Sequence, residues 1–120
     1  MKTEMTATEL SKILQEVEHY AAEASRKYLN EKLGGRDQFP CGFAWVDITG
    51  FNGGRVNGNT KMGKMLKAAG VDQSYDRKFQ LWMPGRSGAQ NVDVAVAGCE
   101  EAARVLESHG FETSVGSRWD

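Results

Sequence analysis

Three polar clusters, each containing or following glycine, hold the side chains best suited to contact a ligand. They are Asn57–Lys61, Arg86–Asn91 and Gly116–Asp120. The first two join a strand-like run to a helix-like run, and the third ends the last strand-like run. If the strands run parallel, all three clusters meet at one end of the sheet, beside two helix N-termini where backbone N–H groups favour anions. The sequence therefore predicts one shared anion-binding site.

Asn59, Thr60 and Lys61 begin the middle helix-like run in the first cluster. A helix start offers free N–H groups and the positive end of the helix dipole, and Lys61 adds a point charge. We expect all three residues to contact the ligand, with simple helix capping as the alternative. The glycine spacing around them is not that of a Walker motif, so nucleotide hydrolysis is not indicated.

Gln90 and Asn91 precede the last helix-like run, and Trp82 lies near the end of the strand-like run before it. The two amides can donate and accept hydrogen bonds at a base edge or a sugar. An exposed Trp82 can stack on a planar group. We expect these three residues in the ligand site as well. The alternatives are an N-cap role for Asn91 and a core position for Trp82.

Arg118 and Asp120 belong to the third cluster and flank a tryptophan. The planar guanidinium of Arg118 fits a phosphate or carboxylate through two parallel hydrogen bonds. We assign both residues to the same ligand site. The alternative is that Arg118 forms an ion pair with Asp120, or with Asp47, a lone carboxylate inside an apolar strand-like run.

No catalytic residue, metal site or cofactor is expected. The sequence has no G-x-S-x-G turn and no histidine beside a nucleophile motif. Cys41 and Cys99 lie in apolar stretches, and neither they nor His19 and His109 have the spacing of metal ligands. We therefore expect free thiols and a protein that is not an enzyme.

Residues 6–33 are predicted to form one long helix, which begins at a capping box of Thr6 and Glu9. Its apolar positions recur at heptad spacing: Leu10, Leu14, Val17, Ala21, Ala24 and Tyr28. Such a helix either covers its own domain or pairs with a second copy. Its length of about 42 Å exceeds what a small sheet offers. We expect a homo-oligomer formed through residues 1–35, attached to a core of residues 36–120.

The core is predicted to alternate between strands and helices. Strand patterns cover 41–49, 78–83 and 111–117, and helical patterns cover 59–69 and 91–109. The predicted fold class is α/β, with the long N-terminal helix followed by a β-α-β-α-β core and a three-stranded sheet. The short first crossover leaves an α+β fold with antiparallel pairing as the alternative.

Composition narrows the choice of partners and location. The chain has 120 residues, 40% of them hydrophobic, which suits a globular protein. A net charge of −1 gives no field toward nucleic acid or an anionic membrane, so neither is expected as a partner. We find no apolar run long enough to span a bilayer and no signal-peptide pattern, and we expect a cytoplasmic location.

Five segments resemble a largely uncharacterised group of small proteins common in tailed-phage genomes. The segments lie within residues 38–120 and are Cys41–Val46, Asn59–Lys64, Gln80–Pro84, Gln90–Asp93 and Gly116–Asp120. The helical anchor before a small α/β core is also similar in architecture to phage Thoeris anti-defence sponge proteins. That similarity implies sequestration of a cyclic nucleotide immune signal, without cleavage, in the host cytoplasm.

The expected function is non-catalytic binding of a small anionic, nucleotide-like ligand. The alternative is a phage accessory or inhibitor protein that acts by protein–protein contact without a small ligand.

Overall fold

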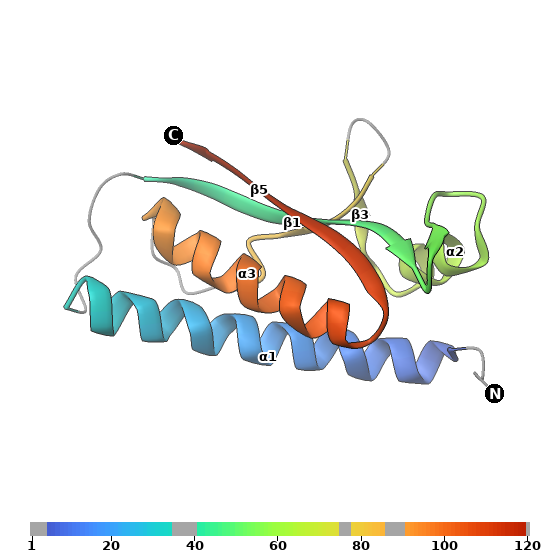
Figure 1. Ribbon diagram of the computed structural model, residues 1–120, viewed down its shortest axis with the longest axis horizontal. Coiled ribbons are helices and arrows are strands. Elements are labelled where there is room, and N and C mark those ends of the chain that lie inside the picture. Colours follow the sequence, from blue (N-terminus) through green and yellow to red (C-terminus); the bar gives the residue numbers. More distant parts are fainter. Residues whose placement is uncertain (1–4, 35–40, 75–77, 86–90, 120) are drawn as a thin grey trace.

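The structure is a computed structural model that describes residues 5–34, 41–74, 78–85 and 91–119. Those residues form a mixed fold that begins with a long helix, as the sequence predicts (Figure 1). The elements in chain order are α1 (Ala7–Lys32), β1 (Gly42–Phe51), β2 (Gly54–Arg55), α2 (Lys61–Ala68), β3 (Asp72–Gln73), β4 (Phe79–Trp82), α3 (Val92–Ser108) and β5 (Phe111–Trp119).

β1 is the central strand of a five-stranded sheet. β5 pairs with one edge of β1 along nearly its whole length, beginning with Gly42 opposite Trp119. β4 pairs with the other edge, where Trp45 lies opposite Trp82. The two-residue strands β2 and β3 pair with β1 and β4 respectively. All of these pairings are antiparallel.

The prediction of a parallel, three-stranded sheet is therefore wrong, and the antiparallel alternative is the one observed. The first connection explains the difference. α2 has only eight residues and is followed by β3, which forms a hairpin with β4. The chain consequently enters β4 against the direction of β1. β2 and β3 were missed because a two-residue strand has no alternation to detect.

β4 and β5 run parallel to each other, because each is antiparallel to β1 and β1 lies between them. α3 connects them, so β4, α3 and β5 form a β-α-β unit in which β1 lies between the two parallel strands. An isolated bridge between Cys41 and Asn91 holds the start of α3 beside the start of β1. The ends of β4 and β5 therefore lie at the same end of the sheet as the N-terminus of α3.

α1 begins at the predicted capping box, in which Thr6 and Glu9 exchange side-chain and backbone hydrogen bonds. It packs against α3 and runs antiparallel to it (Figure 1). Leu10, Val17 and Ala21 have no exposed surface within one chain. Many of the apolar positions that recur at heptad spacing are thus covered by the chain itself. α1 belongs to the same hydrophobic core as the sheet. Self-association through this helix stays a prediction.

Small residues bring α1 and α3 close together. Ser25 of α1 is fully buried, and its hydroxyl donates a hydrogen bond of 2.8 Å to the carbonyl of Val94. A Cβ atom at Gly98 of α3, or at Gly85, would collide with Oγ of Ser25. A larger residue at Gly98 would therefore separate the two helices, and one at Gly85 would push the segment after β4 away from α1.

The two faces of the sheet carry different side chains. The inner face packs against α3 and is formed by buried apolar residues, among them Ala44, Val46, Ile48 and Phe79. Alternation along the strands places every second residue on the opposite side. α1 and α3 both lie on the inner side (Figure 1). We call the opposite side the outer face; by register it carries Phe43, Trp45, Asp47, Gln80, Trp82, Ser114, Gly116 and Arg118.

Candidate functional site

Two tryptophans stack across neighbouring strands on the outer face. The ring planes of Trp45 and Trp82 differ by 6°, and their centroids are 5.4 Å apart. Phe43 also contacts Trp82, with ring centroids 5.7 Å apart. Parallel, offset rings at such separations are a favourable arrangement for aromatic side chains. The three rings form an aromatic cluster centred on β1 and β4.

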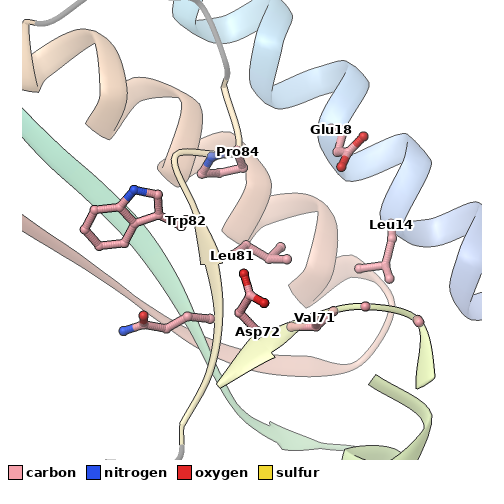
Figure 2. Close-up of a pocket in the computed structure, with 10 residues that line it drawn as sticks. Leu14, Glu18, Val71, Asp72, Leu81, Trp82 and Pro84 are labelled. Atoms are coloured by element: carbon pink, nitrogen blue, oxygen red, sulfur yellow. The ribbon is translucent and has the colours of Figure 1, made fainter. Parts of the chain in front are cut away.

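Gly116 allows the indole of Trp45 to lie against β5. A Cβ atom at Gly116 would be 2.5 Å from Cε2 of Trp45, so a larger residue would displace this ring. Trp82 retains 50% of its surface exposed. Figure 2 shows Trp82 and Leu81 projecting from opposite sides of β4. The cluster therefore offers solvent an aromatic surface on the outer face.

Arg118 lies on the same face, opposite Phe43 in the pairing of β5 with β1. Its side chain is exposed. Asp47, a predicted partner, is four residues further along β1, which corresponds to about 13 Å of extended strand. The structure accordingly records no ion pair between these two described residues. Asp120, the other predicted partner, lies outside the described residues.

Asp47 is an unusual residue for the middle of a sheet. It is only 8% exposed, and it lies between Gln80 on β4 and Ser114 on β5. Among the residues that the structure describes, no hydrogen-bond partner is found for its buried Oδ1 atom. Burying a carboxylate oxygen without a partner costs free energy. Asp47 is therefore a candidate contact for a group that is not part of the described chain.

Asn59, Thr60 and Lys61 form a capping turn at the start of α2. Thr60 is the N-cap, and its Oγ1 accepts a hydrogen bond from the N–H of Gly63 and donates one to the carbonyl of Asn57. The N–H of Asn59 donates to Oδ1 of Asn57. Capping, the alternative interpretation, accounts for these contacts.

The first cluster is also far from the third. α2 follows β2, which pairs with β1 at Gly50 and Phe51, whereas Arg118 pairs with β1 at Phe43. Lys61 and Arg118 therefore lie at opposite ends of the sheet within one chain. The expected shared site depended on parallel strands, and the antiparallel sheet does not bring all three clusters together.

Asn91 lies at the same end of the sheet as Arg118, but its side chain is engaged in the fold. It is 1% exposed, and its Oδ1 accepts hydrogen bonds from the N–H groups of Asp93 and Val94 at 2.8 and 3.2 Å. The N-cap interpretation explains its burial. Gln90 lies outside the described residues.

A hollow of about 180 Å³ opens beside Trp82, on the β3 side of β4 and beyond the short pairing of β4 with β3 (Figure 2). Its lining includes Leu14, Glu18, Val71, Asp72, Leu81 and Pro84. Glu18 and Asp72 are acidic, and the described part of the lining contains no lysine, arginine or histidine. This hollow does not suit the anionic ligand that the sequence predicts.

A second hollow, of about 460 Å³, lies between α1 and α2. It shares Leu14, Glu18 and Ala69 with the first and adds Met65 and Ala68, so its wall is largely apolar. The two hollows adjoin, and we call them together the α1 groove.

The titratable side chains that the structure describes give no indication of catalysis or metal binding. His19 lies 3.5 Å from a carboxylate oxygen of Glu23, and His109 lies 3.5 Å from one of Glu16. Within the described ranges, no three His, Cys, Asp or Glu side chains gather closely enough to hold a metal ion. No described helix combines the length and apolar character needed to cross a membrane. Nothing in this geometry points to catalytic activity.

Phe43 and Trp45 were not predicted as site residues, and Asp47 was considered as an ion-pair partner of Arg118. Apolar residues fill nearly every position of the predicted strand 41–49, which favours a strand that is buried on both faces. The run alternates large aromatic residues with a small one, Ala44, and then places a charge at position 47. That alternation indicates two unlike faces and was the available signal.

Comparison with protein-family models, with curated proteins and with solved structures finds no match to this chain.

Proposed function

We propose that the protein binds a small, planar, nucleotide-like ligand on the outer face of the sheet, without catalysing a reaction. The observation that supports this most is the half-exposed Trp82, stacked on Trp45 and supported by Gly116. Exposed aromatic side chains on an open sheet are a common way of stacking bases. Arg118 supplies a planar fork for phosphate on the same face.

The distance between Arg118 and the tryptophan pair, measured along β1, fits the length of a nucleotide. Arg118 is beside Phe43, and the tryptophan pair follows at Trp45, two residues further on. Two residues of extended strand span about 7 Å. A base stacked on Trp82 can therefore direct its sugar and phosphate toward Arg118.

We propose a cyclic nucleotide as the first ligand class to test. The similarity in architecture to phage Thoeris anti-defence sponge proteins motivates this choice. In that role the protein would sequester an immune signal in the host cytoplasm and leave it chemically intact.

The binding test uses calorimetric titration of the wild-type protein with a panel of cyclic and linear nucleotides. Trp82→Ala should weaken binding by about 1–3 kcal/mol, the range for a base stacked on an aromatic side chain. Arg118→Ala should cost about 1.5–3 kcal/mol, as for a hydrogen bond to a charged group. Arg118→Lys should recover only part of this loss, because an ammonium lacks the planar fork.

Two matched variants remove a tryptophan and an arginine that lie away from the proposed site. Trp119 is 72% exposed but pairs with Gly42, which places it on the inner side of the sheet. Arg55 is exposed on β2, at the far end of β1. Trp119→Ala and Arg55→Ala should leave the affinity unchanged. Equal losses in these controls, or no binding of any nucleotide, would refute the proposed function.

A second candidate function is contact with a protein partner through the α1 groove. The apolar wall of the groove and its carboxylates at Glu18 and Asp72 match a basic amphipathic helix in both hydrophobicity and charge. This candidate corresponds to the accessory or inhibitor role that the sequence left open.

A helical peptide of leucine and lysine is a suitable probe for the α1 groove. Glu18→Lys should weaken its binding through charge repulsion, whereas Glu31→Lys, an exposed change in the last turn of α1, should not. Fluorescence anisotropy of the labelled peptide measures both. Equal binding by the two variants would exclude the groove as the site of contact.

A further inference from the structure

The buried carboxylate of Asp47 has no assigned role in the stacking and phosphate contacts described above. It is nine-tenths buried, and its Oδ1 has no hydrogen-bond partner among the described residues. The register turns Asp47 to the outer face, the same face as Trp45. Its cross-strand neighbours are Gln80 and Ser114, neither of which neutralises a charge.

A carboxylate oxygen that is buried without a partner is unfavourable for the free protein. Burial removes water from the charged oxygen, and no described group replaces the lost hydrogen bond. Asparagine has nearly the same shape and would avoid the buried charge. The acidic residue is more readily explained if a ligand supplies hydrogen-bond donors at this point.

Asp47 continues a line of side chains along the outer face. Arg118 is beside Phe43, the stacked tryptophans are at Trp45, and Asp47 is two residues beyond, about 7 Å further along the strand. A base stacked on Trp82 with its phosphate toward Arg118 therefore turns its opposite edge toward Asp47.

We propose that Asp47 recognises a base edge with two adjacent N–H donors, as in guanine, and this inference rests on the proposed function. A carboxylate accepts two hydrogen bonds side by side. The ring N–H and exocyclic amino group of guanine match it, whereas adenine, cytosine and uracil place acceptors next to their donors. An arginine side chain of a partner protein also presents adjacent N–H donors, but it carries no phosphate. Arg118 on the same face therefore favours a nucleotide over such an arginine.

The test compares three cyclic mononucleotides with the same phosphate: cyclic GMP, cyclic IMP and cyclic AMP. Wild-type protein should bind cyclic GMP tightest. Cyclic IMP, which lacks the amino group, should bind about tenfold more weakly, as expected for one lost hydrogen bond to a charged group. Cyclic AMP should bind more weakly still. Asp47→Asn should bind cyclic GMP no better than cyclic AMP.

Glu112→Gln is the matched control, because it removes an exposed carboxylate from β5 opposite Gly50, far from Trp82. It should keep the preference for guanine. Asp47→Asn should melt no lower than the wild type, because asparagine keeps the shape of the side chain in this buried position and carries no carboxylate. If that variant fails to fold, the wild-type series with the three bases still decides the question.

Three results would overturn the inference. Equal binding of the three nucleotides, or a preference for cyclic AMP, would refute the role of Asp47 and leave the stacking function intact. Binding of arginine amide in place of every nucleotide would assign the face to a protein partner instead. Absence of all nucleotide binding would refute the proposed function itself.

Discussion

At the scale of single residues, Cys99 shows most clearly how burial changes chemistry. Burial, with a smaller contribution from the charge of Glu100, raises the pKa of the Cys99 thiol from 9.0 to about 12. The thiol has no exposed surface. Between these two pH values the unfolded chain loses the proton while the folded chain keeps it, so the folded state is disfavoured as the pH rises. Below pH 9 the thiol is protonated in both the folded and the unfolded chain, so its full contribution to the free energy of unfolding is present there.

We predict that the free energy of unfolding falls from pH 9 toward pH 12 more steeply in the wild type than in Cys99→Ala. Denaturant unfolding at several pH values measures both slopes, and taking the difference removes the contribution of other groups. Cys41→Ser is the matched control for the loss of a cysteine, at a position that is only partly buried. Parallel slopes for the wild type and Cys99→Ala would contradict the burial argument.

Residue type alone could not separate capping from ligand binding. Thr60 and Asn91 are suited to both, because the same oxygen that caps a helix can contact a ligand. Their capping contacts depend on local backbone geometry that the sequence does not specify uniquely. Trp82 and Arg118 were predicted as site residues and share the outer face. Their ligand contacts stay a prediction.

At the scale of elements, the position of α1 changes what a mutation in it should do. Val17 has no exposed surface and belongs to the core shared with α3. A charge there would be buried without a partner. We predict that Val17→Glu unfolds the protein at ordinary temperature, because the total stability of a domain is only about 5–15 kcal/mol. Circular dichroism reports this loss directly.

Lys12→Glu, an exposed charge change on the same helix, is the control and should remain folded. Sedimentation of the same samples tests the predicted homo-oligomer. A folded Val17→Glu monomer, obtained from an oligomeric wild type, would show that this face of α1 pairs with a second copy.

The elements themselves were largely predictable, but their arrangement was not. The helices predicted over 6–33, 59–69 and 91–109 match α1, α2 and α3 to within two residues at each end, and Thr6, Thr60 and Asn91 are the observed N-caps. Strand direction depends on which edge of β1 each later strand reaches. That choice is made by contacts between residues far apart in sequence, and no local pattern records it.

At the scale of the whole molecule, the fold is a sheet with both long helices on one side (Figure 1). An antiparallel sheet can leave its second face to solvent. Here that face carries an aromatic stack, a buried carboxylate and an arginine in line along β1. A net charge of −1 provides no general attraction for an anion. The affinity for a nucleotide that we propose would therefore have to come from these local contacts.

The most direct test of binding on the outer face follows the backbone amide signals and the three tryptophan indole N–H signals by nuclear magnetic resonance while cyclic nucleotides are added. We predict shifts at Trp45, Trp82 and the backbone amide of Arg118. Trp119, on the inner side, and Lys61, at the far end of the sheet, should not move. Shifts centred on Lys61 and α2, or no shift at any signal with excess nucleotide, would contradict binding on the outer face.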